Sequence, residues 1–124
     1  MNWNKKIVLI TGGTGSFGQS FTRYLLNKKR PPVIRIFSRD EFKQYQMQQE
    51  FTNNRLRFLL GDVRDVTRLE RAMDGVDIVI HAAALKHIPA AEYNPFEPIK
   101  TNILGTQNVV EACLNTGVKK AVLI

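Results

Sequence analysis

A short glycine-rich stretch constrains the fold of this chain more than any other feature. Residues 7–18 read IVLITGGTGSFG, an apolar run followed directly by glycines at positions 12, 13, 15 and 18. The apolar run predicts a buried strand, and Ser16 begins a predicted helix. A strand that turns at once into a helix needs residues that tolerate positive φ, as glycine does. The stretch therefore predicts a strand-turn-helix unit with a tight turn.

Apolar runs and helical patterns alternate along the rest of the chain. Four more runs predict strands, and the stretches between them have the spacing of helices. The predicted strands are residues 7–11, 33–37, 56–60, 77–81 and 121–124, and the predicted helices are residues 16 to 27 or 28, 40–52, 67–73 and 95 or 98 to 116. Strands that are apolar throughout are typical of a parallel sheet covered on both faces. The order therefore predicts one three-layer α/β domain.

Apolar residues within the predicted helices mark candidate buried faces. The first helix carries Phe17, Phe21, Tyr24 and Leu25 at helical spacing, the second carries a candidate stripe of Phe42, Tyr45 and Phe51, and the fourth carries Ile99, Ile103, Val110 and Leu114. The second helix is otherwise strongly polar, so its aromatic stripe is the sequence signal that it packs on the sheet. Gly117 is expected to cap the end of the fourth helix.

Composition and charge restrict the class of protein and of ligand. The 124 residues are 44% hydrophobic and 23% charged, as in globular proteins, and no segment approaches the roughly 18 apolar residues of a membrane span. The net charge of +7 would suit nucleic acid, but the basic residues are scattered and form no nucleic-acid motif. We expect an anionic small ligand such as a nucleotide, with no nucleic-acid partner and no membrane span.

The first residues and the cysteine content bear on the compartment. The opening MNWNKK lacks the apolar stretch of a secretory signal, so the cytoplasm is the expected location. Cys113 is the only cysteine, which excludes an internal disulfide and agrees with a reducing compartment. We assign no metal-binding residue and no catalytic residue within the 124 residues.

The glycine-rich turn has the spacing of a phosphate-binding loop. Gly13, Gly15 and Gly18 form G-x-G-x-x-G, and Gly12, Gly15 and Gly18 form an overlapping G-x-x-G-x-x-G. Bare backbone lets a pyrophosphate approach, and the start of the next helix offers unpaired N–H groups and a positive dipole. The position after a strand and before a helix predicts dinucleotide binding. The expected contacts are Gly12, Thr14, Gly15, Ser16, Phe17 and Gly18.

The end of the second predicted strand indicates which dinucleotide binds. Ser38 and Arg39 stand where an acidic residue would bind the ribose hydroxyls of NAD. An arginine there can pair with a 2′-phosphate and stack on adenine, and Lys43 lies one helical turn along, so NADP is favoured over NAD. The alternative is that Arg39 is an ordinary solvated side chain. Asp40 and Glu41 have the character of helix-start residues.

The third predicted strand ends in GDVRD, which supplies two more candidates. Asp62 is placed to accept a hydrogen bond from the adenine amino group, with Val63 packing beside the ring. The alternative is that Asp62 and Asp65 make turns and cap the next helix. We expect Asp62 to contact the cofactor and Asp65 to be structural.

The fourth predicted strand ends in HAAALKHIP, at the expected switch point beside the first strand. Ala82 to Ala84 should pass the nicotinamide ribose, and Lys86 lies just beyond the strand's carboxyl end, where ligands bind in open α/β sheets. Lys86 is a candidate contact for a sugar-nucleotide phosphate, a hydroxyl or the cofactor. His81 and His87 are expected to be structural rather than catalytic. Asn102 either faces the cofactor or bonds to a neighbouring loop.

In their order and spacing, five motifs resemble a known enzyme superfamily. TGGTGSFG, SRDEFKQ, GDVRD, HAAALKHIPAAEYNP and TNILGTQNV are similar to those of the extended short-chain dehydrogenase/reductases, whose Rossmann-type fold is a doubly wound parallel sheet. More closely, they resemble the inverting UDP-N-acetylglucosamine 4,6-dehydratases of bacterial surface-polysaccharide and flagellin-sugar biosynthesis. TGxxGxxG is common to the superfamily, whereas SRDE-x-KQ together with AALKH is much narrower.

The resemblance implies a set of NADP contacts and a reaction. The implied contacts are Thr14 to Phe17, Ser38, Arg39, Asp40, Glu41, Phe42, Lys43, Asp62, Val63 and Ala82, with Lys86 near cofactor and substrate and Asn102 near the nicotinamide half. In the implied reaction, tightly held NADP⁺ takes hydride from sugar C4, water leaves from C5 and C6, the hydride returns to C6, and C5 is inverted.

The resemblance also implies catalytic groups that this sequence does not contain. In the family they follow the fifth strand, in segments of the kind S/T-x-D-K and Y-x-x-x-K; here only Tyr24 and Lys28 have the second spacing, on the first helix. We therefore expect residues 1–124 to be a truncated NADP-binding Rossmann domain of a longer, homo-oligomeric UDP-sugar enzyme, without its catalytic segment and substrate domain. A UDP-sugar 4-epimerase and a non-catalytic NADP-sensing module are the alternatives.

Overall fold

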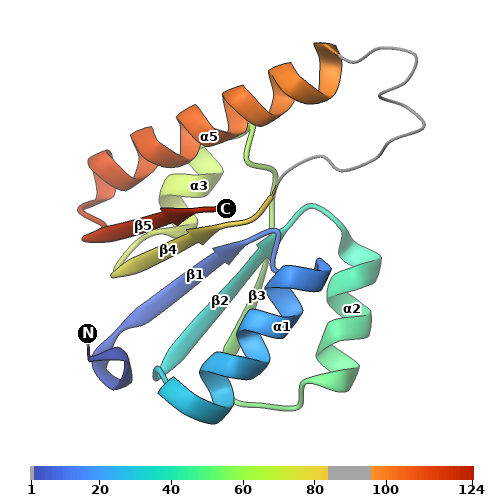
Figure 1. Cartoon of the computed structure of the whole chain (residues 1–124), viewed down its shortest axis with the longest axis vertical. Coiled ribbons are helices and arrows are strands. Elements are labelled where there is room, and N and C mark those ends of the chain that lie inside the picture. The colour runs from blue at the N-terminus through green and yellow to red at the C-terminus, as the bar shows by residue number, and fades with distance from the viewer. Residues whose placement is uncertain (1, 84–95) are drawn as a thin grey trace.

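The computed structural model is a five-stranded parallel sheet with helices on both faces (Figure 1). It describes residues 2–83 and 96–124, and in the second range it describes side chains from residue 102 on. The strands are β1 (Ile7–Thr11), β2 (Val33–Ser38), β3 (Leu56–Leu60), β4 (Ile78–His81) and β5 (Lys120–Leu123), and the helices are α1 (Ser16–Tyr24), α2 (Glu41–Glu50), α3 (Val66–Ala72) and α5 (Phe96–Thr116). A short helix, η1 (Trp3–Lys5), precedes β1, and a wider turn, η2 (Leu25–Lys29), extends α1. The predicted alternation of strands and helices is confirmed.

The strand order β3-β2-β1-β4-β5 places β1 at the centre of the sheet. At the carboxyl end of β1, Thr11 lies level with Phe37 of β2 and with His81 of β4. All five strands run in parallel, so their carboxyl ends meet along one edge of the sheet. The order reverses beside β1, which is the switch point where open α/β sheets bind ligands. The Rossmann-type doubly wound sheet is confirmed.

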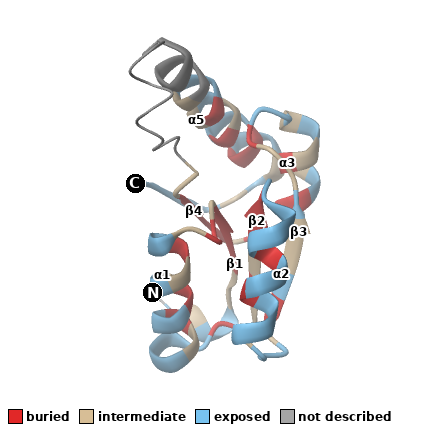
Figure 2. Ribbon diagram, turned by 90° about the vertical axis from the view of Figure 1, so that its right-hand side faces the viewer, coloured by how far each residue is buried: buried red, intermediate tan, exposed pale blue. Residues whose placement is uncertain are grey.

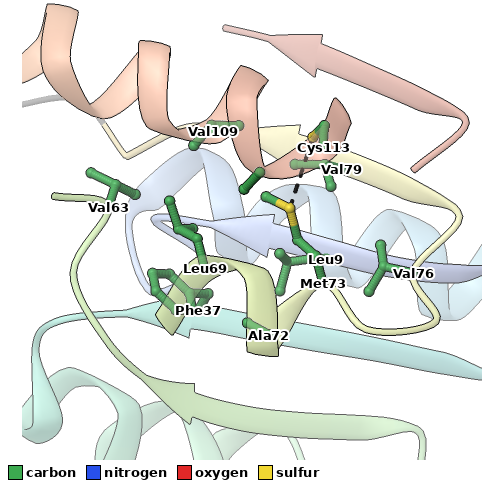
Figure 3. Packing of buried hydrophobic residues seen from close by; sticks show 11 residues of the cluster. Leu9, Phe37, Val63, Leu69, Ala72, Met73, Val76, Val79, Val109 and Cys113 are labelled. Atoms are coloured by element: carbon green, nitrogen blue, oxygen red, sulfur yellow. Dashed lines mark hydrogen bonds between the residues drawn. The ribbon is translucent and has the colours of Figure 1, made fainter. Parts of the chain in front are cut away.

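Each face of the sheet has its own apolar cluster, which makes the fold three layers thick. On the face covered by α1, η2 and α2 the buried residues are Val8, Ile10, Leu25, Ile34, Ile36, Met47, Leu56, Ile78 and Ile80. On the face covered by α3 and α5 they are Leu9, Phe37, Val63, Leu69, Ala72, Met73, Val76, Val79, Val109, Ala112 and Cys113 (Figure 3). Adjacent residues of a strand thus enter opposite layers, as expected for strands covered on both faces.

On the first helix, only part of the predicted apolar set is buried. Leu25 is fully buried, whereas Phe17 and Tyr24 are 36% and 46% exposed. Phe21 lies between these two rings, with centroids 5.7 Å from Phe17 and 6.1 Å from Tyr24, so the three aromatic rings form a stack along the helix. The chain then leaves the helix at Arg30, whose φ is 51°.

On α2, the predicted buried stripe is wrong for two of its three residues. Phe42 and Tyr45 are 67% and 62% exposed, and Phe51 lies past the helix end and is half-buried. The residues that face the sheet are Gln44 and Met47, spaced one turn apart. Figure 2 shows α2 exposed along most of its length. A helix at the edge of a layer buries only a narrow face. Here that face consists of one polar residue, Gln44, and one apolar residue, Met47.

On α5, the larger apolar residues also point away from the core. Ile103, Val110 and Leu114 are 56%, 41% and 79% exposed, and the Ile99 side chain lies outside the described residues. The buried residues of this helix include Val109, Ala112, Cys113 and Gly105. Small side chains let α5 pack closely on the layer below. No helix in the described parts of the chain combines the length and hydropathy needed to cross a membrane.

The turn between β1 and α1 depends on two glycines. Gly12 has a φ of 65°, and a Cβ there would lie 2.7 Å from the carbonyl oxygen of Ala82. A Cβ at Gly18 would lie 2.5 Å from the Cα of Gly13. The first glycine lets the turn touch the end of β4, and the second lets α1 pack on the start of its own turn.

A buried polar chain joins β1, β4 and α5 at the carboxyl edge. The Thr11 hydroxyl oxygen accepts the Ala82 N–H at 3.1 Å, and Thr11 Oγ1 lies 2.7 Å from His81 Nδ1. His81 Nε2 lies 3.4 Å from the hydroxyl of Thr106 on α5. The two ring nitrogens of His81 thus each face a threonine hydroxyl, one on β1 and one on α5. The structural role predicted for His81 is confirmed.

A test of the β1–α1 turn compares two glycines that have the same backbone conformation. Gly12→Ala should lower the free energy of unfolding by about 2 kcal/mol or more, because it adds a clash with Ala82 to the strain of a left-handed residue. Gly75→Ala is the control, since Gly75 has a φ of 75° but no atom of the described residues within 4 Å of its added Cβ, and should cost about 1 kcal/mol. Denaturant unfolding measures both. Equal losses would mean that the close approach to β4 contributes nothing.

A second test concerns the protonation of His81. Burial lowers the pKa of the His81 imidazole, so the unfolded chain takes up the proton first as the pH falls. The stability that neutral His81 contributes is therefore complete above about pH 6.5 and is lost as the pH falls through the lower folded pKa. In a His87→Gln background, where His81 is the only histidine, adding His81→Asn should flatten this pH dependence. An NMR titration that gave a pKa above 6.5 for His81 would contradict the prediction.

Candidate functional site

A pocket of about 500 Å³ lies at the carboxyl edge of the sheet, around the switch point. It is lined by the turn after β1 with the start of α1, the ends of β2 and β3, the start of α2, the end of β4 and the first turns of α5. Its lining residues are Gly12, Thr14, Gly15, Ser16, Phe17, Gly18, Phe37, Ser38, Arg39, Asp40, Lys43, Gly61, Asp62, Val63, Ala82, Ala83 and Asn102. Segments far apart in sequence are thus brought to one cavity by the parallel order of the strands.

The first wall of the pocket is the glycine turn and the start of α1. Gly15 is the residue before the helix, and no side chain caps the N-terminus there. Among the described residues, a Cβ on Gly15 would meet just one atom within 4 Å, the carbonyl oxygen of Gly12 at 3.4 Å, so the turn presents bare backbone to the cavity. Uncapped N–H groups at a helix start, with no side chain in front of them, suit an anionic group.

The second wall is the end of β2 and the start of α2. Ser38 is 7% exposed and Arg39 projects with much of its side chain in solvent. The Asp40 carboxylate accepts the Lys43 N–H at 3.0 Å, which caps α2 and confirms the helix-start character predicted for Asp40. Glu41 begins α2, but it and Phe42 are not among the lining residues, and their cofactor contacts stay predictions.

The third wall is Asp62, which is held by a neighbouring arginine. The Asp62 carboxylate accepts three hydrogen bonds from the Arg64 side chain, at 2.7 to 3.1 Å, and one from the Arg64 backbone N–H at 2.9 Å. These hydrogen bonds hold the pKa of Asp62 below its ordinary value, against the opposing effect of partial burial. Arg39 lies farther away, with Nη1 at 3.9 Å from Asp62 Oδ2. The carboxylate therefore stays ionised and oriented at the pocket wall.

The remainder of the third loop is fixed by helices. Asp65 accepts the Arg68 N–H at 3.1 Å and caps α3, as predicted for a structural residue. The Asn108 side chain on α5 donates to the Val63 carbonyl at 3.0 Å. A Cβ on Gly105 would lie 2.8 Å from Val63, so α5 packs directly on this residue. Val63 is thereby held against the pocket from behind.

The fourth wall joins the end of β4 to α5. Ala82 and Asn102 both line the pocket, and their contacts with a cofactor stay predictions. The helix reaches the pocket because Thr106, one turn on, lies against His81. Lys86 and His87 lie outside the described residues, so the contacts predicted for Lys86 stay predictions.

Three residues important to the site were not predicted from the sequence. Gln44, Arg64 and Asn108 do not line the pocket, but each holds a segment that does. A signal existed for all three: Gln44 ends the narrow motif SRDEFKQ, Arg64 lies inside GDVRD, and Asn108 lies inside TNILGTQNV. A sequence motif alone does not distinguish a residue that contacts a ligand from a residue that holds its neighbour in place.

Comparison with known proteins places the chain in a family. A UDP-N-acetylglucosamine 4,6-dehydratase (inverting) of Campylobacter jejuni is 57% identical over 98% of this chain, and a UDP-glucose 4-epimerase of Rickettsia felis is 47% identical over 96% of it. The crystal structure of DesIV, a dTDP-glucose 4,6-dehydratase from Streptomyces venezuelae with NAD and TYD bound, is 29% identical and superimposes over 93% of this chain with a TM-score of 0.81.

This chain matches only part of the length of each relative. The chain spans 36% of the length of both relatives and 38% of the DesIV chain. The family model described as "Polysaccharide biosynthesis protein" matches residues 8–124, which is nearly the whole sequence. The chain therefore belongs to the polysaccharide biosynthesis protein family, within the extended short-chain dehydrogenase/reductases that its motifs resemble.

Proposed function

We propose that this chain is the NADP-binding part of a nucleotide-sugar 4,6-dehydratase that acts on UDP-N-acetylglucosamine in bacterial surface-polysaccharide or flagellin-sugar biosynthesis. The observation that carries the proposal is the single pocket into which the sheet brings the glycine turn, the end of β2, Asp62 with Val63, and Asn102. The substrate rests on the 57% identity to a UDP-N-acetylglucosamine 4,6-dehydratase. When bound, the nicotinamide ring would accept a hydride from the sugar and return it.

The described residues fit a dinucleotide lying across the switch point. The pyrophosphate would lie over the bare backbone of Gly12 to Phe17, where a side chain at Gly15 would intrude. Adenine would lie between Val63 and Arg39, with its amino group donating to Asp62, whose oxygens still have capacity beside the Arg64 hydrogen bonds. The nicotinamide half would extend toward Ala82 and Asn102.

The choice of NADP rests on the charges at the end of β2. In NAD-binding Rossmann folds an acidic side chain there accepts hydrogen bonds from the ribose hydroxyls. Here Ser38 and Arg39 take that position, and the carboxylate of the next residue, Asp40, already accepts the N–H of Lys43. Arg39 and Lys43 both line the pocket and would supply positive charge to a 2′-phosphate.

The remaining expectations concern the longer protein. A UDP-sugar would bind beyond the nicotinamide, where Lys86 is the proposed substrate contact from this chain. The catalytic residues would come from sequence after Ile124, and the intact enzyme is expected to be a cytoplasmic homo-oligomer. The 47% identity to a UDP-glucose 4-epimerase gives a second candidate function, because both reactions need the same cofactor pocket.

Product analysis of the intact protein separates these functions. Incubated with UDP-N-acetylglucosamine, a 4,6-dehydratase forms a 4-keto-6-deoxy product that has lost one water, which mass spectrometry detects. An epimerase leaves the mass unchanged and retains the 6-hydroxyl group, and a sensing module binds the dinucleotide without forming product. Residues 1–124 alone should bind dinucleotide and form neither product. Formation of either product by residues 1–124 alone would contradict the proposal that this segment binds the dinucleotide without supplying the catalytic residues.

Cofactor preference is tested by removing the charge at Arg39. Arg39→Ala should weaken NADP binding about 10- to 100-fold and NAD binding much less, since a hydrogen-bonded ion pair with the 2′-phosphate is lost. Lys28→Ala is the control, because it removes the same charge from an exposed position at the end of η2. Titration calorimetry measures both dinucleotides. An equal loss for NADP and NAD would show that Arg39 does not recognise the 2′-phosphate.

A further inference from the structure

Gln44 is a buried polar residue beside the pocket and outside its lining. It lies on the inner face of α2 with 6% of its surface exposed. Its Nε2 lies 2.8 Å from the Leu59 carbonyl of β3, 3.2 Å from the Ser38 carbonyl and 3.1 Å from Ser38 Oγ. One amide group thus joins the carboxyl ends of β2 and β3 to α2.

The orientation of this amide is fixed by its neighbours. Two of its three partners are backbone carbonyls, which can only accept hydrogen bonds, so the NH₂ group and not the oxygen must face them. Nε2 carries two protons and has three acceptors. One proton points to the Leu59 carbonyl, and the other is shared between the two Ser38 oxygens. The Ser38 carbonyl also accepts the Gly61 N–H at 2.9 Å, which ties the same strand end to the loop before Asp62.

This arrangement determines what Ser38 can offer to a ligand. Ser38 Oγ accepts a hydrogen bond from Gln44, so the Ser38 hydroxyl proton is directed elsewhere. Ser38 is 7% exposed, and it lines the pocket at the position where Rossmann folds bind the adenosine ribose. A hydroxyl held in this way is a preset donor. A phosphate, which has acceptor oxygens only at neutral pH, matches such a donor better than a ribose hydroxyl does.

We propose that Gln44 is a positioning residue that holds the Ser38 hydroxyl as a hydrogen-bond donor to the 2′-phosphate of NADP, and so contributes to the preference for NADP over NAD. The inference rests on the proposed function, since it requires a dinucleotide in this pocket. Gln44 acts through Ser38 and does not touch the ligand. Through Ser38, the ligand would meet a neutral hydrogen-bond donor in addition to the charge of Arg39. Ser38 is buried, and a hydrogen bond at a buried position is less screened by water.

A double-mutant cycle on the intact protein tests this role. Ser38→Ala should weaken NADP binding about 10-fold and NAD binding less, as expected for loss of a hydrogen bond to a charged group. Gln44→Met keeps the side-chain length, removes the amide, and should weaken NADP binding several-fold. The double variant should bind NADP no more weakly than Ser38→Ala alone, because Gln44 acts through the hydroxyl. Gln48→Met, an exposed glutamine on the same helix, is the control and should leave both affinities unchanged.

The possible outcomes separate the inference from the proposed function. If Gln44→Met weakens NADP and NAD equally and its effect adds to that of Ser38→Ala, Gln44 has only a structural role and the inference is wrong. If Gln44→Met does not fold, Ser38→Ala alone decides, and equal losses for the two dinucleotides overturn the inference. If the unaltered protein binds neither dinucleotide, the proposed function itself fails, and the inference with it.

Discussion

The structure depends on the contact between the turn after β1 and the end of β4. With a φ of 65° and no side chain, Gly12 brings its backbone against Ala82, so that β1 and β4 end at the same level. The Thr11 hydroxyl accepts from Ala82 and bonds to His81, which in turn meets Thr106 on α5. One close backbone approach therefore sets the position of α1 on one face and of α5 on the other.

Three polar side chains outside the pocket lining each hold a segment that forms the pocket. The Gln44 amide joins β2 and β3, the Arg64 guanidinium holds Asp62, and the Asn108 amide holds Val63. No described side-chain nitrogen or oxygen that is fully buried lacks a hydrogen-bond partner. Buried networks that are completely bonded are rigid. Rigidity at the strand ends means that a ligand meets preset donors and acceptors, so little ordering is needed when it binds.

The sequence predicts the sheet and the turn between β1 and α1 well, because both are determined by local patterns. Apolar runs identify strands covered on both faces, and the glycines are required at the turn itself. The helix faces are predicted poorly: Tyr45 of α2 and Leu114 of α5 are exposed, while Gln44 and Ala112 are buried. A helical pattern predicts the spacing of apolar residues but not which side of the helix packs on the sheet. A polar residue such as Gln44 can be buried because carbonyls from other elements accept its hydrogen bonds, and the local sequence does not show those carbonyls.

Asp40 and Asp62, the two carboxylates that line the pocket among the described residues, already accept hydrogen bonds from the protein, and this bears on the ligand. The Asp40 carboxylate is engaged in capping α2, and Asp62 is engaged mainly by Arg64 at 2.7 Å rather than by Arg39 at 3.9 Å. Since attraction falls with distance, Arg39 is only weakly restrained by Asp62 and can turn toward a ligand. A ribose hydroxyl needs an acceptor as well as a donor, whereas a phosphate needs donors and positive charge. This arrangement is the physical reason why the proposed function names NADP rather than NAD.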